Sequence, residues 1–322
     1  MSPETATRAD DSTTLNRSYG GRDRRTTLHW KHTPGRHVPL TDTSTAQRDE
    51  VDYVSGRTRV YGIVGDPIEQ VRSPEMITAE FVRRSIDALM IPIHVRPGDF
   101  DTCIAQLKRI QNLDGLVFTI PYKRAAIALA DDVGIQAQAI GAINALARRP
   151  QGRWSGEIFD GLGCVEAFRR AGYAIEGQRL MLIGAGGAGA AIGVAMAHER
   201  PRSIRIHDID RKRAADLATS IATVDSSIDV DVGAPVTIDI DILLNASPVG
   251  MLADPRVPVD ISVIDPRTIV FDAIVKPEPT KLLALAERRG CRIVFGRDMM
   301  RGQISKIVDF FTAHSAGTDA CR

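Results

Sequence analysis

The sequence predicts an α/β fold of two lobes, and three observations support this prediction. Short apolar segments typical of buried strands alternate with segments whose apolar residues recur at helical spacing, a rhythm that indicates parallel sheets. The length of 322 residues is sufficient for two domains. A glycine-rich turn at residues 184–189 lies early in a second series of strands and helices.

The first lobe is expected to begin at Arg57. A buried strand over 58–64 is closed by Pro67, and Ser73-Pro74 is expected to begin a helix. Ser73 is the predicted N-cap of this helix, and apolar residues continue at helical spacing to Leu89. The lobe's remaining predicted elements are strands at 91–95, 115–120, 142–148 and 152–156, and helices at 100–110 and 123–130.

A connecting helix at 160–170 leads to the second lobe. A strand at 180–183, the glycine turn and a helix at 187–198 open it, and the alternation predicts a doubly wound, Rossmann-type parallel sheet. A last helix over 297–313 is expected to fold back onto the first lobe. The other predicted elements are strands at 203–207, 228–232, 242–245 and 269–271, and helices at 211–221 and 280–289, the latter ended by Gly290.

Composition narrows the class of protein and its partners. Hydrophobic residues make up 43% and charged residues 25%, which is typical of a soluble globular protein. Because 41 Lys and Arg nearly balance 40 Asp and Glu, we expect no nucleic-acid partner. The four cysteines have no spacing typical of a disulfide framework or of structural zinc, so we expect a cytoplasmic protein without a metal site.

Two segments could be mistaken for targeting or membrane elements. The first fifty residues mix charges of both signs with few apolar residues, which predicts a disordered leader over 1–56. The uncharged stretch 180–197 is close to the length of a membrane span. It contains five glycines and six alanines, however, so we expect no membrane span.

The glycine turn has the G-x-G-x-x-G pattern of a dinucleotide-binding loop. It follows an apolar strand and opens a helix, whose N-terminal amides favour a pyrophosphate. The first glycine permits the tight turn, the second lets the backbone approach the ligand, and the third lets the helix pack on the sheet. The predicted cofactor-binding residues of this turn are Gly184, Ala185, Gly186, Gly187, Ala188 and Gly189.

Asp208 bears on the choice of cofactor. It ends the next strand, nineteen residues after Gly189, where a carboxylate can accept hydrogen bonds from ribose hydroxyls and would repel a 2′-phosphate. The sequence therefore favours NAD over NADP. Arg211 and Lys212 lie close enough to leave dual use open.

Seven short motifs occur in order along the chain. They are Tyr61 to Ile68, Thr119-Ile120-Pro121-Tyr122-Lys123, Gly141 to Asn144, Asp160-Gly161-Leu162-Gly163, Gly184 to Gly189, Asn245 to Met251, and Gly296 with Met300 and Gln303. In this order and spacing they make the chain resemble the shikimate/quinate dehydrogenase family over residues 59–311. The resemblance implies an oxidoreductase with an N-terminal substrate-binding lobe, a Rossmann lobe and an active site in the cleft.

The resemblance also assigns roles to residues. Lys123 is the expected acid and base that moves the hydroxyl proton during hydride transfer, and Asp160 is expected to orient it and hydrogen-bond the substrate hydroxyl. We expect substrate contacts from Ser73, Thr119, Asn144 and Gln303, and further cofactor contacts from Ser247 and Gly296.

Departures from the family pattern concern the substrate. Val71 stands where the family has the first Ser of Ser-x-Ser, Val117 replaces an Asn, and Val275 replaces a Tyr. In the family, that Ser and Tyr help hold a carboxylate. Three valines would leave a carboxylate poorly paired. We therefore expect a shikimate- or quinate-like cyclic polyol, or a ring without a carboxylate, rather than shikimate itself. Arg72 is a possible replacement charge, although an exposed loop arginine explains it equally well.

Two other functions stay open. One is a non-catalytic sensor of NAD(H) or a metabolite on the same fold, and the other is a dehydrogenase of a one-carbon folate or an amino acid. The retained Lys123 and Asp160 favour an oxidoreductase of the shikimate/quinate dehydrogenase type over both. The predicted organisation is a leader at 1–56, a substrate-binding lobe at 57–159 plus 297–322, and an NAD-binding lobe at 160–296, in a monomer or homodimer.

Overall fold

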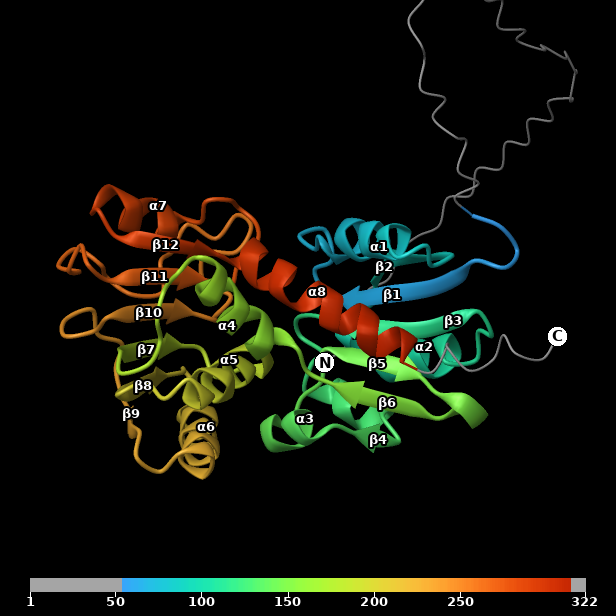
Figure 1. The fold of residues 1–322 in the computed structure, drawn as a ribbon, viewed down its shortest axis with the longest axis horizontal. Helices are drawn as coiled ribbons and strands as arrows, with labels where there is room; N and C mark the ends of the chain where they lie inside the picture. The colour runs from blue at the N-terminus through green and yellow to red at the C-terminus, as the bar shows by residue number, and fades with distance from the viewer. Residues whose placement is uncertain (1–53, 314–322) are drawn as a thin grey trace, which may run out of the picture. The chain divides into compact units, whose positions relative to one another are not determined.

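The fold contains two six-stranded sheets flanked by helices, as the computed structural model of the chain describes it over residues 54–313 (Figure 1). The predicted leader therefore lies almost entirely outside the described residues, as do Cys321 and the last residues of the predicted substrate-binding lobe. Within residues 54–313, no helix is both long and apolar enough to cross a membrane. The predicted α/β class with two lobes is confirmed.

The first sheet has the strand order β2-β1-β3-β5-β6-β4. Strand β1 pairs in parallel with β2 and β3, whereas β5 is antiparallel to both β3 and β6. The elements of this part are β1 (Arg59–Gly65), α1 (Ser73–Arg83), β2 (Ala88–His94), α2 (Phe100–Leu107), β3 (Leu113–Phe118), β4 (Asp132–Val133), α3 (Ile135–Ile140), β5 (Ala145–Arg148) and β6 (Trp154–Glu157), with 3-10 turns at Pro97–Asp99, Ala125–Leu129 and Pro150–Gly152.

Helix α1 is shorter than predicted. It ends at Arg83, and Ser85 adopts a left-handed backbone conformation with φ of 57°, which an α-helix cannot accommodate. Strand β2 then begins at Ala88, so Leu89 belongs to the sheet. The predicted helix at 123–130 is reduced to a short 3-10 turn, and the short elements β4 and α3 were not predicted.

The second sheet is entirely parallel, in the order β12-β11-β10-β7-β8-β9. Its central strands are almost continuously apolar because helices cover both faces. Strand β12 was not predicted. The elements are α4 (Asp160–Arg170), β7 (Arg179–Ile183), α5 (Gly187–His198), β8 (Ser203–His207), α6 (Arg211–Val224), β9 (Asp229–Val232), β10 (Ile242–Asn245), β11 (Ile269–Asp272), α7 (Lys281–Arg288), β12 (Arg292–Phe295) and α8 (Gly296–Thr312).

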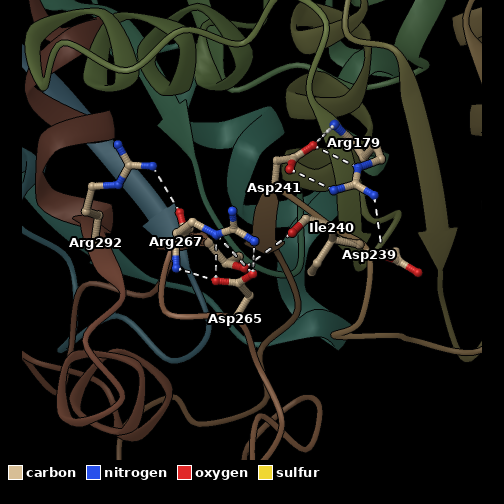
Figure 2. Close-up of polar contacts among 8 residues, drawn as sticks. Arg179, Asp239, Ile240, Asp241, Asp265, Arg267 and Arg292 are labelled. Carbon is tan, nitrogen blue, oxygen red and sulfur yellow. Dashed lines mark hydrogen bonds and ion pairs between the residues drawn. The ribbon is translucent and has the colours of Figure 1, made fainter.

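Polar contacts fix the amino-terminal ends of the strands in the second sheet, at the edge opposite the glycine turn (Figure 2). Arg179 at the start of β7 forms two 3.0 Å side-chain hydrogen bonds with Asp241, which precedes β10. Arg267 pairs with Asp265 over 2.7 Å, and Arg292 donates to the Arg267 carbonyl oxygen. Because Arg179 is half-buried and Arg267 is exposed, solvent screens these ion pairs, and each contributes little to stability.

Helix α8, drawn in red in Figure 1, packs against α4 and α1 and so connects the second sheet with the first. Glycines permit the closest approaches. A Cβ on Gly163 of α4 would lie 2.4 Å from the Met299 carbonyl oxygen of α8, and one on Gly302 would lie 2.5 Å from the Gly163 carbonyl oxygen. On the other side of α4, a Cβ on Gly161 would lie 2.2 Å from the Ala191 carbonyl oxygen of α5. The glycines of the Asp160-Gly-Leu-Gly motif therefore allow α4 to fit between α5 and α8.

Candidate active site

A cavity of about 150 Å³ lies where the carboxyl ends of strands from both sheets meet helix α8. Strands β1 and β3 contribute from the first sheet, and the segments after β10 and β11 contribute from the second. This is where ligands bind in open parallel sheets. All residues predicted for catalysis and substrate binding line the cavity: Ser73, Val71, Val117, Thr119, Lys123, Asn144, Asp160, Val275 and Gln303.

Lys123 and Asp160 form a buried ion pair in this cavity. Lys123 Nζ donates to Asp160 Oδ2 over 2.6 Å, and the two side chains are only 14% and 4% exposed. Asp160 is the first residue of α4, where the partial positive charge of a helix N-terminus favours a carboxylate. The pair thus places a titratable amine and a carboxylate side by side, away from bulk water.

The residue before Lys123 anchors the turn after β3. The Tyr122 hydroxyl donates to the Val95 carbonyl oxygen over 2.5 Å, and its ring stacks on Phe100 with centroids 4.2 Å apart. Tyr122 is therefore fixed in the core of the first lobe. Lys123 projects from this fixed point towards Asp160.

Asn144 and Gln303 form a second polar pair in the cavity. Asn144 Nδ2 donates to Gln303 Oε1 over 2.9 Å, and Asn144 Oδ1 accepts from the Phe159 backbone N–H over 3.0 Å. Both side chains are at most 7% exposed. Because the Asn144 amide is held at both ends, it fixes the orientation of the Gln303 amide.

Ser73 has a different position from the one predicted. Arg72 occupies the N-cap position of α1 without a side-chain cap, and Ser73 is the first helical residue. Its hydroxyl is thus not used as a helix cap, and the residue lines the cavity together with Thr119. Arg72 pairs with Glu75 at the surface and is not among the described lining residues.

The charge of the cavity is close to balanced. Of the described residues that line it, only Lys123 and Asp160 are charged, and they pair with each other. Val71, Val117 and Val275 line it without a hydrogen-bonding side chain. No lining cation is thus left over for a carboxylate, which is costly to bury unpaired.

The glycine turn connects β7 to α5, and two of its glycines are required by the chain itself. Gly184 has a φ of 98°, which disfavours other residues, and a Cβ on Gly189 would lie 1.9 Å from the Gly184 carbonyl oxygen. A Cβ on Gly187 would lie 2.9 Å from Lys123 Cβ, so the turn and the lysine are in direct contact. Gly186 differs, because a Cβ there would meet no atom within 4 Å. This open space at a helix N-terminus fits the approach of a dinucleotide pyrophosphate.

Three other predicted cofactor residues line the cavity, namely Ala188, Ser247 and Gly296. A buried chain of hydrogen bonds holds Ser247 in place. Its hydroxyl donates to Asn245 Oδ1 over 2.7 Å, and Asn245 Nδ2 donates to Asp272 Oδ1 over 3.0 Å. Thr280 donates to the other Asp272 oxygen over 2.7 Å. Burial raises the pKa of Asp272 to about 6 although these hydrogen bonds lower it.

Two residues near the site were not predicted. Arg124 donates to the Ala185 carbonyl oxygen over 3.0 Å, so the residue after Lys123 also touches the glycine turn. Gln70 lines the cavity and is buried, at 7% exposure. The sequence could have indicated this residue, because Gln70 lies in the loop between the strand that ends at Gly65 and the predicted substrate contact Ser73.

Comparisons with known proteins agree with this geometry. Residues 63–146 match the family model described as the shikimate dehydrogenase substrate binding domain. The chain is 30% identical over 275 residues to the shikimate dehydrogenase (NADP(+)) of Methanobrevibacter smithii, covering 83% of this chain and 95% of that protein. It is 34% identical over 245 residues to the enzyme of the same description from Thermococcus kodakarensis, covering 76% and 87%. The solved structure of ligand-free 5-ketofructose reductase from Gluconobacter sp. strain CHM43 has a TM-score of 0.68 and 26% identity, covering 80% of this chain and 94% of that one.

The relatives correct the predicted choice of cofactor. NAD was favoured over NADP on the basis of Asp208, but both relatives are named as NADP(+) enzymes, so this prediction is wrong. The structure supplies a physical reason. Asp208 Oδ2 accepts from the Ala185 N–H over 2.6 Å and Oδ1 accepts from the Asp210 N–H over 2.8 Å. The carboxylate is thus engaged with the backbone, and the basic residues at 211–213 follow it at the start of α6.

Proposed function

The chain belongs to the shikimate dehydrogenase family, and from this premise we propose that it interconverts a ring alcohol and its ketone with NADP(H). We further propose that the substrate is a cyclic polyol without a carboxylate. Membership of the family makes the protein an oxidoreductase of the shikimate dehydrogenase type. The single observation that carries the proposed activity is the buried pair of Lys123 and Asp160 against the glycine turn.

Lys123 moves the proton of the reacting hydroxyl. When bound, the nicotinamide accepts or supplies the hydride. In oxidation Lys123 Nζ takes the hydroxyl proton as a neutral amine and becomes an ammonium, and in reduction the ammonium returns the proton to the carbonyl oxygen. Asp160 Oδ2 holds Nζ in position, and Asp160 Oδ1 is available to accept a hydrogen bond from the substrate hydroxyl.

The two parts of the chain divide the work of binding. Residues 57–159 together with α8 supply Ser73, Thr119, Asn144 and Gln303, which have hydroxyl and amide groups suited to a polyol. The segment 160–296 holds the cofactor through its glycine turn and α5. Of the exposed basic residues at the start of α6, Lys212 pairs with Asp216 and Arg213 pairs with Asp210, so Arg211 would hold the 2′-phosphate of NADP.

The charge balance of the cavity supports a substrate without a carboxylate. The lining lysine is already paired, and Val71 and Val275 line the cavity where the resemblance places the groups that hold a carboxylate. The Gluconobacter relative is named as a reductase of 5-ketofructose, a keto sugar that has no carboxylate. The intact Lys123 and Asp160 disfavour the alternative of a non-catalytic sensor, which has no need of them.

The test is to follow NADPH absorbance with the full chain, using NADP and NAD in parallel against shikimate, quinate, aminoshikimate and carboxylate-free cyclic polyols. We expect NADP-dependent turnover of a carboxylate-free ring. Replacing the exposed Arg211 by Ala should raise the KM for NADP by about tenfold and leave that for NAD unchanged. Efficient turnover of shikimate would contradict the proposed substrate, and faster turnover with NAD would contradict the cofactor. Tight cofactor binding without turnover of any ring would favour the sensor.

A further inference from the structure

Gln70 carries the one fully buried side-chain polar atom of the described cavity lining that has no hydrogen-bond partner. Its Nε2 donates to the Pro67 carbonyl oxygen over 2.7 Å. Its Oε1 is buried and accepts from no donor within residues 54–313. Buried amide oxygens without a partner are rare in folded proteins, because the lost hydration is not replaced. The cavity therefore lacks a donor at this position.

The orientation of the Gln70 amide is fixed by Pro67. If the amide were rotated end for end, its oxygen would face the Pro67 carbonyl oxygen, and two acceptors would be opposed. In the observed orientation one N–H of Nε2 is bonded to Pro67, and Oε1 has no partner. Gln70 thus contributes an unpartnered acceptor to the cavity lining.

The loop of Gln70 is held against the segment that follows β11. Val71 follows Gln70, and Lys276 Nζ donates to the Glu69 carbonyl oxygen over 3.1 Å. This bond ties the loop of Gln70 to the segment that carries Val275. Lys123 is the one Lys or Arg among the described lining residues, and it is paired with Asp160.

We propose that Gln70 is a specificity-determining residue, whose Oε1 accepts a hydrogen bond from a substrate hydroxyl at the ring position where an acid substrate carries its carboxylate. This inference rests on the proposed function. It adds which substituent of the substrate ring is recognised at the part of the cavity that the valines line. A hydroxyl or hydroxymethyl group can donate to Oε1. A carboxylate has only acceptors and would face Oε1 without a proton between them, so Gln70 also disfavours acids.

The test uses ring substrates that differ at one position and follows NADPH absorbance with the full chain. The substrates are shikimate and its analogues in which the carboxylate is replaced by hydroxymethyl or by methyl. The variants are Gln70→Met, which removes the acceptor at similar volume, and Gln70→Lys, which replaces it with a cationic donor. Gln138→Met is the matched control, because Gln138 also donates to a backbone carbonyl, that of Val133, and lies outside the described cavity lining.

We expect wild type to prefer the hydroxymethyl ring. Gln70→Met should lower kcat/KM for that ring by about 10- to 100-fold and leave the methyl ring nearly unchanged, since only the former loses a hydrogen bond. Gln70→Lys should shift the preference towards shikimate, a gain that a disturbed loop would not produce. Gln138→Met should have no effect. Equal losses on the hydroxymethyl and methyl rings, or no shift with Gln70→Lys, would overturn the inference alone. If wild type turns over none of these rings, the proposed function fails and the inference fails with it.

Discussion

Asn144 and Gln303 lie 159 residues apart in the sequence and share a buried hydrogen bond of 2.9 Å. The same Asn144 amide accepts from the N–H of Phe159, the residue that precedes Asp160. One side chain thus connects the last helix to the start of α4. Because Asp160 in turn holds Lys123, contacts through Asn144 link α8 to the residue that we propose to move the proton.

Replacing Lys123 should separate catalysis from folding. We expect Lys123→Met to lower kcat by about 100- to 10,000-fold, because the reacting hydroxyl loses its acid and base. It should also lower the thermal unfolding midpoint, since it leaves the buried Asp160 carboxylate without its partner. The double variant Lys123→Met/Asp160→Asn removes that unpaired charge, and it should regain stability without regaining activity.

The control for this experiment is Lys306→Ala, at an exposed position on α8. Activity is measured from NADPH absorbance and stability by thermal denaturation followed by circular dichroism. Near-normal kcat in Lys123→Met with every substrate that wild type turns over would rule out the assigned role.

The glycine turn provides a matched pair of substitutions. Gly186→Ala adds a methyl group in open space with a φ of −67° that alanine tolerates, so stability should not change. We expect NADPH affinity to fall by about tenfold or more, because the methyl group occupies the space proposed for the pyrophosphate. Gly189→Ala places its Cβ 1.9 Å from the Gly184 carbonyl oxygen and should destabilise the fold by about 1–3 kcal/mol.

Fluorescence titration with NADPH and thermal denaturation distinguish these two effects. An unchanged NADPH affinity in a folded Gly186→Ala protein would mean that the cofactor does not approach the turn at this glycine.

The sequence predicted the features that depend on local pattern. The long strands and helices of the second sheet follow from continuous apolar runs and helical periodicity, and the glycine turn follows from the backbone conformation that Gly184 needs. The residues predicted for catalysis and substrate binding line one cavity because the motifs follow strand ends, which a parallel sheet brings together. The early end of α1 was missed because a left-handed residue such as Ser85 has no reliable signal in sequence.

The features that were missed depend on contacts between distant parts of the chain. The role of Asp208 was misjudged because its carboxylate is engaged by backbone amides of two loops, which the sequence does not reveal. The contact of Gly187 with Lys123 crosses between the two parts of the fold. The free oxygen of Gln70 becomes evident only when every buried donor near it has been accounted for.

Asp272 should give the protein a distinctive dependence of stability on pH. Burial raises its pKa in the folded protein to about 6, above the value of about 3.9 expected when unfolded. Between these values the folded state holds a proton that the unfolded state releases, so the contribution of Asp272 to stability is complete below about pH 4 and is lost as pH rises through 6. The loss amounts to about 3 kcal/mol.

Other carboxylates, such as Glu80, have lowered pKa values and act in the opposite direction, so the measurement must be a difference. We expect the free energy of unfolding of wild type minus that of Asp272→Asn to fall between pH 4 and pH 7. Urea denaturation at several pH values measures it, with Asp101→Asn on the exposed face of α2 as control. A difference that is flat or rises over this range would show that Asp272 is ionised throughout.

The valine-lined end of the cavity should be convertible to carboxylate binding. Val71→Ser and Val275→Tyr together introduce two hydroxyl donors at lining positions, where the family resemblance places the groups that hold a carboxylate. Hydrogen bonds to a charged acceptor are stronger than neutral ones, so we expect kcat/KM for shikimate to rise by about 10- to 100-fold. The KM for NADP should not change, because neither substitution touches the glycine turn. Val82→Ser, at a position on α1 that is 52% exposed, is the control. If the double variant folds and shikimate turnover is no better than in wild type, Val71 and Val275 do not explain the choice of substrate, and the selection lies elsewhere in the cavity.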